Sequence, residues 1–279
     1  MLECVVNVSE GRDDVVLQAL ADAAGDALLD LHRDAHHNRA VLTLVGEAAP
    51  RAVARQAVER LDLRHHDGVH PRLGVVDVVP FAPLAGSTMA DAIEARETFG
   101  RWAASALGVP CFSYGAGGWP SLPELRRAAW KGLLPDHGPR RPHTSAGAIC
   151  VGARPVLVAY NLWLTSDDVA VARRAAAAMR GPCLRALGLL VGDRVQLSMN
   201  LVEPRRLGPA DAYDLADTTL RSLDGDGSTP GSDPIAGTEL VGLVPRAVLE
   251  RIPSDRWAQL DLDDGRTIEA RLARREVRP

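Results

Sequence analysis

The 279-residue sequence is almost devoid of lysine and has no tract of a single charge sign. Lys131 is the only lysine, so nearly all of the 32 basic residues are arginines, and they are spread along the chain without forming a basic tail. With 36 acidic residues, the formal net charge is −4 at pH 7. Proteins that bind nucleic acids concentrate positive charge on one face or tail, so no nucleic-acid partner is expected.

Long apolar runs are also missing. Charged residues or glycine interrupt every apolar stretch well before the roughly 20 residues that a membrane span requires. Residues 1–12 carry Glu3, Asn7 and Glu10, which is atypical of a signal peptide. We therefore expect a cytoplasmic protein without a membrane partner.

The chain has few cysteines, and they do not form a recognisable metal motif. Cys4, Cys111, Cys150 and Cys183 lie far apart with no CxxC spacing, which predicts reduced and mostly buried thiols. Six of the eight histidines fall between residues 32 and 70, but their spacing matches no known ligand signature, so no metal is expected. No GxGxxG or Walker pattern is present, and nucleotide binding is not indicated.

The residues that are present suit a globular protein of two modest domains. Hydrophobic residues make up 46% and charged residues 24% of the chain, which is ordinary for such a protein. The first half predicts the order strand, helix, strand, strand, helix, strand at 3–8, 13–24, 27–32, 40–46, 48–61 and 74–80. A helix at 88–106, a strand at 109–113 and a helix near 121–131 are expected to follow. The second half repeats this order without visible sequence repetition at 155–164, 166–180, 184–191, 194–202, 209–222 and 238–244.

This order is typical of the ferredoxin-like split βαβ unit. The expected fold class is therefore α+β, with two ferredoxin-like βαββαβ subdomains, mixed or antiparallel sheets, and a ligand cleft between them. The N-terminal subdomain is expected over 1–140 and the C-terminal one over 145–250. Residues 251–279 form an extension, in which alternation around the Asp264-Gly265 turn predicts a β-hairpin.

The most informative segment runs from Arg64 to Gly74, directly before the apolar strand. It holds three histidines, two arginines and two glycines within one turn. Pro71 fixes its own φ and biases His70 toward an extended backbone. A histidine held there is a candidate acid/base group, because its pKa lies near neutral pH. From this run alone, a structural histidine that closes a turn is the slightly better interpretation.

Several other segments occur with this run in a fixed order. They are Glu3–Arg12, Asp30–Arg39, Pro135–Arg154, Ala159–Leu162, Gln196–Leu201 and Glu239–Pro245. With this ordered set, the chain resembles the glutamate formimidoyltransferases (formiminotransferases), folate-dependent enzymes of histidine breakdown. The resemblance runs from about residue 3 to about residue 248 and does not extend to the cyclodeaminase domain that some relatives carry.

The resemblance implies a one-carbon group transferase. The reaction would move a formimino group from N-formimino-L-glutamate to N5 of tetrahydrofolate, which serves as a co-substrate. His70 matches the family's catalytic histidine and would act as the general acid and base. Formiminoglutamate and folate are then the expected small-molecule partners, and we expect a homodimer.

Five further residues are candidates for binding the substrate. Arg39 and Arg72 could clamp carboxylates of glutamate or of the folate tail, or they could be solvated surface arginines. Asn7, Glu10 and Asn38 sit at strand ends beside turns. They either hydrogen-bond the amidine or cap the local backbone.

The segment 138–147 matches the family's folate-binding stretch without a gap. Its residues are Gly138, Pro139, Arg140, Arg141, Pro142, His143, Thr144, Ser145, Ala146 and Gly147. The middle carries two arginines and a histidine where the family has mostly apolar or aromatic residues, and this extra charge could meet a polyglutamate tail.

Val69 stands where the family typically carries glutamate. These two departures motivate two alternatives: a transferase for another formimino donor or acceptor amine, and a non-catalytic folate-binding relative.

Overall fold

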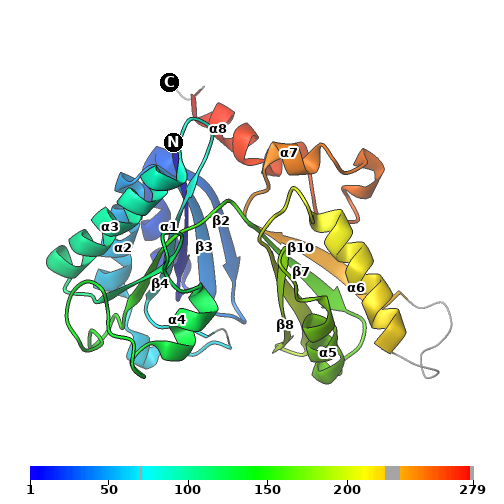
Figure 1. Ribbon diagram of the computed structural model, residues 1–279, viewed down its shortest axis with the longest axis horizontal. Coiled ribbons are helices and arrows are strands. Elements are labelled where there is room, and N and C mark those ends of the chain that lie inside the picture. Colours follow the sequence, from blue (N-terminus) through cyan, green and yellow to red (C-terminus); the bar gives the residue numbers. More distant parts are fainter. Residues whose placement is uncertain (70, 224–232, 277–279) are drawn as a thin grey trace. The chain divides into compact units, whose positions relative to one another are not determined.

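The computed structural model describes residues 1–69, 71–223 and 233–276, which belong to two compact units. Unit 1 spans Met1–Val156 and unit 2 spans Leu157–Pro279. Unit 1 contains a mixed six-stranded sheet and unit 2 an antiparallel four-stranded sheet, each with helices (Figure 1). The expected α+β class is confirmed. Among the described residues, no helix is long and apolar enough to cross a membrane.

The main elements of unit 1 follow the expected order, with one additional strand at the end. They are β1 (Leu2–Val8), α1 (Asp14–Ala24), β2 (Leu28–Asp34), β3 (Arg39–Val45), α2 (Ala48–Arg60), β4 (Val76–Pro83), α3 (Met89–Ala106), β5 (Cys111–Gly115), α4 (Leu122–Ala128) and β6 (Ile149–Ala153). The sheet order is β2-β3-β1-β4-β6-β5. The first four strands pair antiparallel, while β6 pairs parallel to both β4 and β5.

Strand β6 was not predicted from the sequence, where its residues appear only within the Pro135–Arg154 segment of the family resemblance. Its five residues are all buried. A strand buried on both faces is uniformly apolar and shows no alternation, so periodicity does not reveal it. Because β6 lies inside the first sheet, unit 1 extends through Val156.

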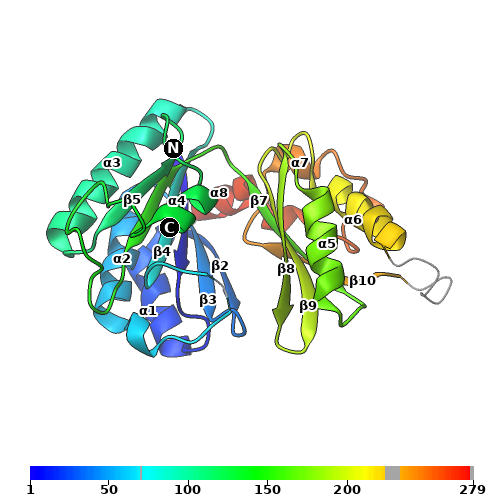
Figure 2. The same ribbon diagram turned by 60° about the horizontal axis from the view of Figure 1, so that its bottom comes forward.

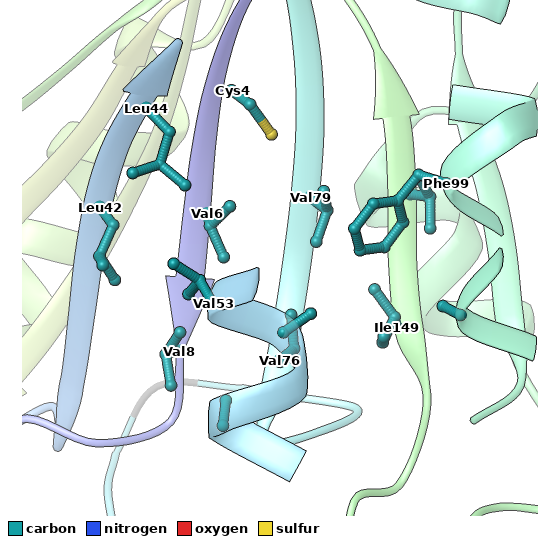
Figure 3. Close-up of a cluster of buried hydrophobic side chains, with 14 of the residues drawn as sticks. Cys4, Val6, Val8, Leu42, Leu44, Val53, Val76, Val79, Phe99 and Ile149 are labelled. Atoms are coloured by element: carbon teal, nitrogen blue, oxygen red, sulfur yellow. The ribbon is translucent and has the colours of Figure 1, made fainter. Parts of the chain in front are cut away.

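Helices α1, α2 and α3 share the main core of unit 1. Cys4, Val6 and Val8 of β1 lie on one side of the strand, together with Val53 of α2 and Phe99 of α3 (Figure 3). Successive side chains of a strand point to opposite faces. Val5 and Asn7, which alternate with Cys4, Val6 and Val8 along β1, therefore point to the other face of the sheet.

That other face is polar at its centre and partly covered by α4. Glu3 and Asn7 of β1, Thr43 of β3 and Asp77 of β4 are all buried polar side chains. Leu125 of α4 packs in a second, smaller apolar cluster over the β4-β6-β5 side of the sheet. The polar residues between β1 and β4 are thus placed beside α4.

Unit 2 repeats the strand–helix order of the first half of unit 1. Its elements are β7 (Val158–Leu164), α5 (Val169–Met179), β8 (Leu184–Val191), β9 (Arg194–Leu201), α6 (Pro209–Leu223), β10 (Ile235–Val241), α7 (Arg246–Leu249) and α8 (Ile268–Glu276). The sheet order is β10-β7-β9-β8, and every pair is antiparallel. Helices α5 and α6 lie against the same face of this sheet and contribute to one core (Figure 2).

The expected β-hairpin in the extension is not formed within the described residues 251–276. Asp264 and Gly265 lie in a 3₁₀ turn, and Ile268–Glu276 is the helix α8. The sequence of α8 is rich in alanine, leucine, glutamate and arginine, whose helix propensity outweighs the two-residue alternation. The segment still protects the edge strand β10, since Asp261 Oδ2 accepts a hydrogen bond from the Leu240 amide at 2.8 Å.

Candidate functional site

Loops from three parts of unit 1 meet at one end of its sheet. Asn38, just before β3, accepts a hydrogen bond from the Gly11 amide at 2.9 Å through its side-chain oxygen. Its side-chain nitrogen donates to the Asp67 carbonyl at 2.9 Å. Asn38 has a φ of 47°, a left-handed conformation that asparagine tolerates better than most residues. This one side chain therefore ties the loop after β1 to the loop before β4.

A polar pocket of about 270 Å³ lies at this end of the sheet. Ser9, Glu10, Asn38, His65 and His66 are among its lining residues. Glu10 Oε1 accepts hydrogen bonds from the backbone amides of Arg12 and Asp13, at 2.6 and 2.9 Å, just before α1. For Glu10 and Asn38, the structure thus shows the backbone-capping role that the sequence analysis left open.

His66 lies between the Asn38 backbone and Arg72. Its Nε2 is 2.9 Å from the Asn38 carbonyl oxygen, and its ring nitrogens contact the Arg72 guanidinium. Burial lowers the pKa of His66, the hydrogen bond with Asn38 opposes this shift, and the positive charge of Arg72 reinforces it. Arg72 also donates to the His37 carbonyl at 3.2 Å. The contacts with His66 and His37 therefore help to orient Arg72.

Arg39 lies within the polar face of the sheet. Its guanidinium donates to the side-chain oxygen of Asn7. Burial lowers the pKa of Arg39 to about 10, Asp77 opposes this shift, and the positive charges of Arg126 and Arg72 reinforce it. Arg126 forms an ion pair with Asp77, and Arg39 and Arg72 interact electrostatically with the same carboxylate; we call these four residues the arginine cluster. The carboxylates of Asp34 and Asp67 also act on Arg39 and Arg72, respectively. Guanidinium groups of this kind can bind an anionic ligand such as a carboxylate.

Asp77 and Arg126 were not found by the sequence interpretation. Asp77 is 2% exposed; its Oδ1 accepts from the Leu73 amide at 2.8 Å, and its Oδ2 accepts from Arg126. Arg126 also donates to the Pro71 carbonyl. An acidic residue inside the apolar strand 75–79 was a usable signal for Asp77. Arg126 lies 49 residues further along the chain, on a short amphipathic helix, and carries no such signal.

The end of the expected folate-binding stretch lies beside the loop before β4. The Leu63 amide donates to the Ser145 carbonyl at 2.7 Å, and the Val75 amide donates to the Ala146 carbonyl at 3.0 Å. Gly147 has a φ of 70°, and a Cβ there would lie 2.2 Å from the Leu73 carbonyl oxygen. Only glycine permits this approach. Residues 145–147 are therefore part of the same loop cluster as 63–75.

The beginning of the same stretch lies elsewhere in unit 1. Gly138 packs near Ala104 of α3 and Pro110 before β5. Residues 139–142 and Thr144 are exposed. His143 closes a turn, since its Nδ1 accepts from the Ala146 amide at 3.1 Å. The structure thus brings residues 145–147 to the loop cluster and leaves Pro139, Arg140, Arg141 and Pro142 at the surface.

His70 lies outside the described residues, so the structure gives it no position. Its neighbour Val69 is 54% exposed. Within the described ranges, no group of three or more histidine, cysteine, aspartate or glutamate side chains is arranged to hold a metal ion. Two of the predicted substrate-binding residues, Arg39 and Arg72, belong to the arginine cluster, and Asn7 binds one of them.

Comparison with known proteins gives consistent results. Residues 1–154 match the model of the formiminotransferase domain, N-terminal subdomain. A glutamate formimidoyltransferase of Streptococcus pyogenes serotype M1 is 31% identical over 89% of this chain and 90% of its own length. One from Thermoplasma acidophilum is 29% identical over 98% of this chain and 97% of its own length. The formimidoyltransferase-cyclodeaminase of Sus scrofa is 33% identical over 89% of this chain, which spans only 51% of that relative.

Proposed function

Because this chain belongs to the formiminotransferase family, and is therefore a transferase, we propose that it transfers a formimino group from N-formimino-L-glutamate to N5 of tetrahydrofolate. The observation that carries the proposal is the arginine cluster beside the 145–147 loop. Formiminoglutamate has two carboxylates, and so does the glutamyl tail of folate. Guanidinium groups bind such carboxylates through paired hydrogen bonds.

Residues of segment 138–147 and its neighbours fit tetrahydrofolate. The exposed side chains of Arg140 and Arg141 suit the carboxylates of the glutamyl tail. Leu63 and Leu73, both partly buried, provide apolar surface near Gly147. A flat heterocycle is bound best by an apolar wall with a few polar anchors, and the backbone groups of residues 145–147 are candidates for those anchors.

In the proposed reaction, N5 attacks the amidine carbon and forms a tetrahedral intermediate. The bond from that carbon to the glutamate nitrogen then breaks, and glutamate leaves as an amine. One proton is lost from N5 and one is gained by the leaving nitrogen. We assign both transfers to His70, because a group with a pKa near neutrality can accept the first proton and donate the second. Arg39 and Arg72 would hold the carboxylates and so orient the reacting atoms.

The assignment to His70 is supported by the state of its neighbours. The ring of His66 is engaged by the Asn38 carbonyl and by Arg72. The His65 side chain is 82% exposed to solvent and lies 3.8 Å from Asp62. These contacts make both residues weaker candidates than His70.

A second candidate is transfer from a different amidine donor, and the exposed apolar side chain of Val69 favours it. A carboxylate at this position would pair with an amidinium or with the acid/base histidine. If the lack of a carboxylate at position 69 has changed the donor that the protein uses, Val69→Glu should raise kcat/KM for formiminoglutamate. No change with any amidine would show that position 69 does not select the donor.

Two measurements test the proposed function. A thermal-shift assay with folinic acid or tetrahydrofolate measures binding, and a turnover assay with formiminoglutamate and tetrahydrofolate measures transfer. We expect folate to raise the melting temperature and turnover to depend on both substrates. Stabilisation without turnover of any amidine would instead indicate a folate-binding protein, and turnover only with another amidine would indicate the second candidate.

We also infer that the two units are ferredoxin-like subdomains. In the order β2-β3-β1-β4 of unit 1, and again in β10-β7-β9-β8 of unit 2, the first strand of the set lies between the third and the fourth. Each set has helices after its first and third strands, which is the split βαβ arrangement.

A further inference from the structure

Arg126 and Asp77 join the helix α4 to the loop that precedes β4. Arg126 donates to both the Asp77 carboxylate and the Pro71 carbonyl. Asp77 in turn accepts from the Leu73 amide at 2.8 Å. Two backbone groups of the loop are therefore fixed by one partly buried ion pair. Arg72 lies between them in the chain.

The pair is well placed to fix this loop and poorly placed to touch a ligand. Asp77 is 2% exposed, and both of its oxygens are used within the protein. Both terminal nitrogens of Arg126 are likewise used by Asp77 and Pro71. A guanidinium can satisfy two acceptors at once because its N–H groups form a rigid planar fork. Lysine cannot reproduce that geometry.

The pair also sets the charge around Arg72 and Arg39. Asp77 opposes the lowering of the pKa of both arginines, while Arg126 promotes it. Removing the Asp77 charge would leave the three guanidiniums with less negative charge nearby to balance their positive charges. Partly buried like charges repel strongly, so the arginines would move apart.

We propose that Arg126 and Asp77 are positioning residues for the transfer reaction, holding the 71–73 loop so that Arg72 is presented to the substrates. This inference rests on the proposed function. Neither residue of the pair contacts the substrate in this proposal. The pair acts on the reaction by holding the backbone of the loop and by orienting Arg72.

The test compares Arg126→Gln, Arg126→Lys and Asp77→Asn with the control Arg127→Gln. Arg127 is the next residue of α4, is exposed, and loses the same charge. The first readout is hydrogen exchange of the backbone amides over residues 71–78, which includes the Leu73 amide. The second is kcat and KM for formiminoglutamate, measured separately. The third is the thermal shift produced by folinic acid.

We expect faster exchange of the 71–78 amides in Arg126→Gln and Asp77→Asn, together with a fall in kcat/KM of about 10- to 100-fold, the usual effect of misplacing a reacting group by about 1 Å. Arg126→Lys should recover part of both effects because it keeps the ion pair. Arg127→Gln should match the wild type. The folinic acid shift should persist in all four variants.

Two results would overturn the proposal. The first is wild-type exchange in Arg126→Gln with a large loss of kcat/KM, since Arg126 would then act on the substrate directly. The second is faster exchange with unchanged kinetics, since the loop would then be fixed for stability alone. If Arg126→Gln does not fold, Arg126→Lys and Asp77→Asn decide between the same outcomes. Absence of turnover in the wild type contradicts the proposed function, and the exchange comparison still reports whether the pair holds the loop.

Discussion

At the scale of single residues, the predicted binding residues differ in their contacts. Glu10 and Asn38 form hydrogen bonds with backbone amides and with one backbone carbonyl, whereas Arg39 and Arg72 interact electrostatically with Asp77. The sequence placed all four near one another because each follows or precedes a strand. It could not distinguish their roles, since a carboxylate or amide at a strand end serves either purpose. That distinction depends on which backbone groups the folded loops bring within hydrogen-bond reach.

His66 should make the folded protein less stable as the pH falls below the usual pKa of a histidine. Its folded pKa is lowered, chiefly by burial, so below pH 6.5 the unfolded chain takes up the proton more readily than the native one. The free energy of unfolding therefore decreases with falling pH in that window. Urea unfolding at pH 7 and at about pH 5.5 should show a smaller decrease in His66→Gln than in the wild type. An equal decrease would mean that His66 is not held neutral.

At the scale of helices and strands, sequence periodicity predicted the elements whose formation depends mainly on local interactions. Most helices and strands of unit 1 were placed within a few residues, because amphipathic patterns and caps such as Asp13 for α1 are local signals. Strand β6 and helix α8 were not predicted correctly. The burial of β6 on both faces depends on neighbours from distant parts of the chain. In α8, helix propensity competed with an alternating pattern that happened to surround a turn-like dipeptide.

Gly147 offers a test of the contact between the 145–147 loop and the loop before β4. Gly147→Ala would place a Cβ 2.2 Å from the Leu73 carbonyl in a backbone conformation with φ of 70°. We expect a loss of about 1–3 kcal/mol in the free energy of unfolding, and a smaller folinic acid shift.

Gly181→Ala is the matched control, because nothing lies within 4 Å of its Cβ position. Denaturant unfolding of both variants measures the difference. Equal stability of the two variants would show that the close approach at residue 147 is not maintained in solution.

At the scale of the whole molecule, the cysteines report on the two units separately. Cys4, Cys111 and Cys150 are buried in unit 1, and Cys183 is partly exposed in unit 2. Burial raises the pKa of Cys111 to about 12 and raises that of Cys4 and Cys150 as well, which suppresses the reactive thiolate.

In the native protein at about pH 8, near the ordinary thiol pKa, a disulfide reagent should therefore react quickly with one thiol only, and Cys183→Ser should abolish that reaction. The remaining three thiols should react only when unit 1 unfolds in denaturant. Rapid reaction of a second thiol in native buffer would contradict the buried core of unit 1.

The proposed role of His70 as the proton carrier in formimino transfer is tested most directly by the turnover rate of His70→Asn with formiminoglutamate and tetrahydrofolate. We expect kcat to fall by about 10²- to 10⁴-fold, the usual contribution of a positioned acid/base group, with the folinic acid shift retained. The pH dependence of the remaining activity should lose its limb near pH 6–7. Wild-type kcat in His70→Asn together with loss of activity in His66→Ala would contradict this role and assign the proton transfer to the neighbouring histidine.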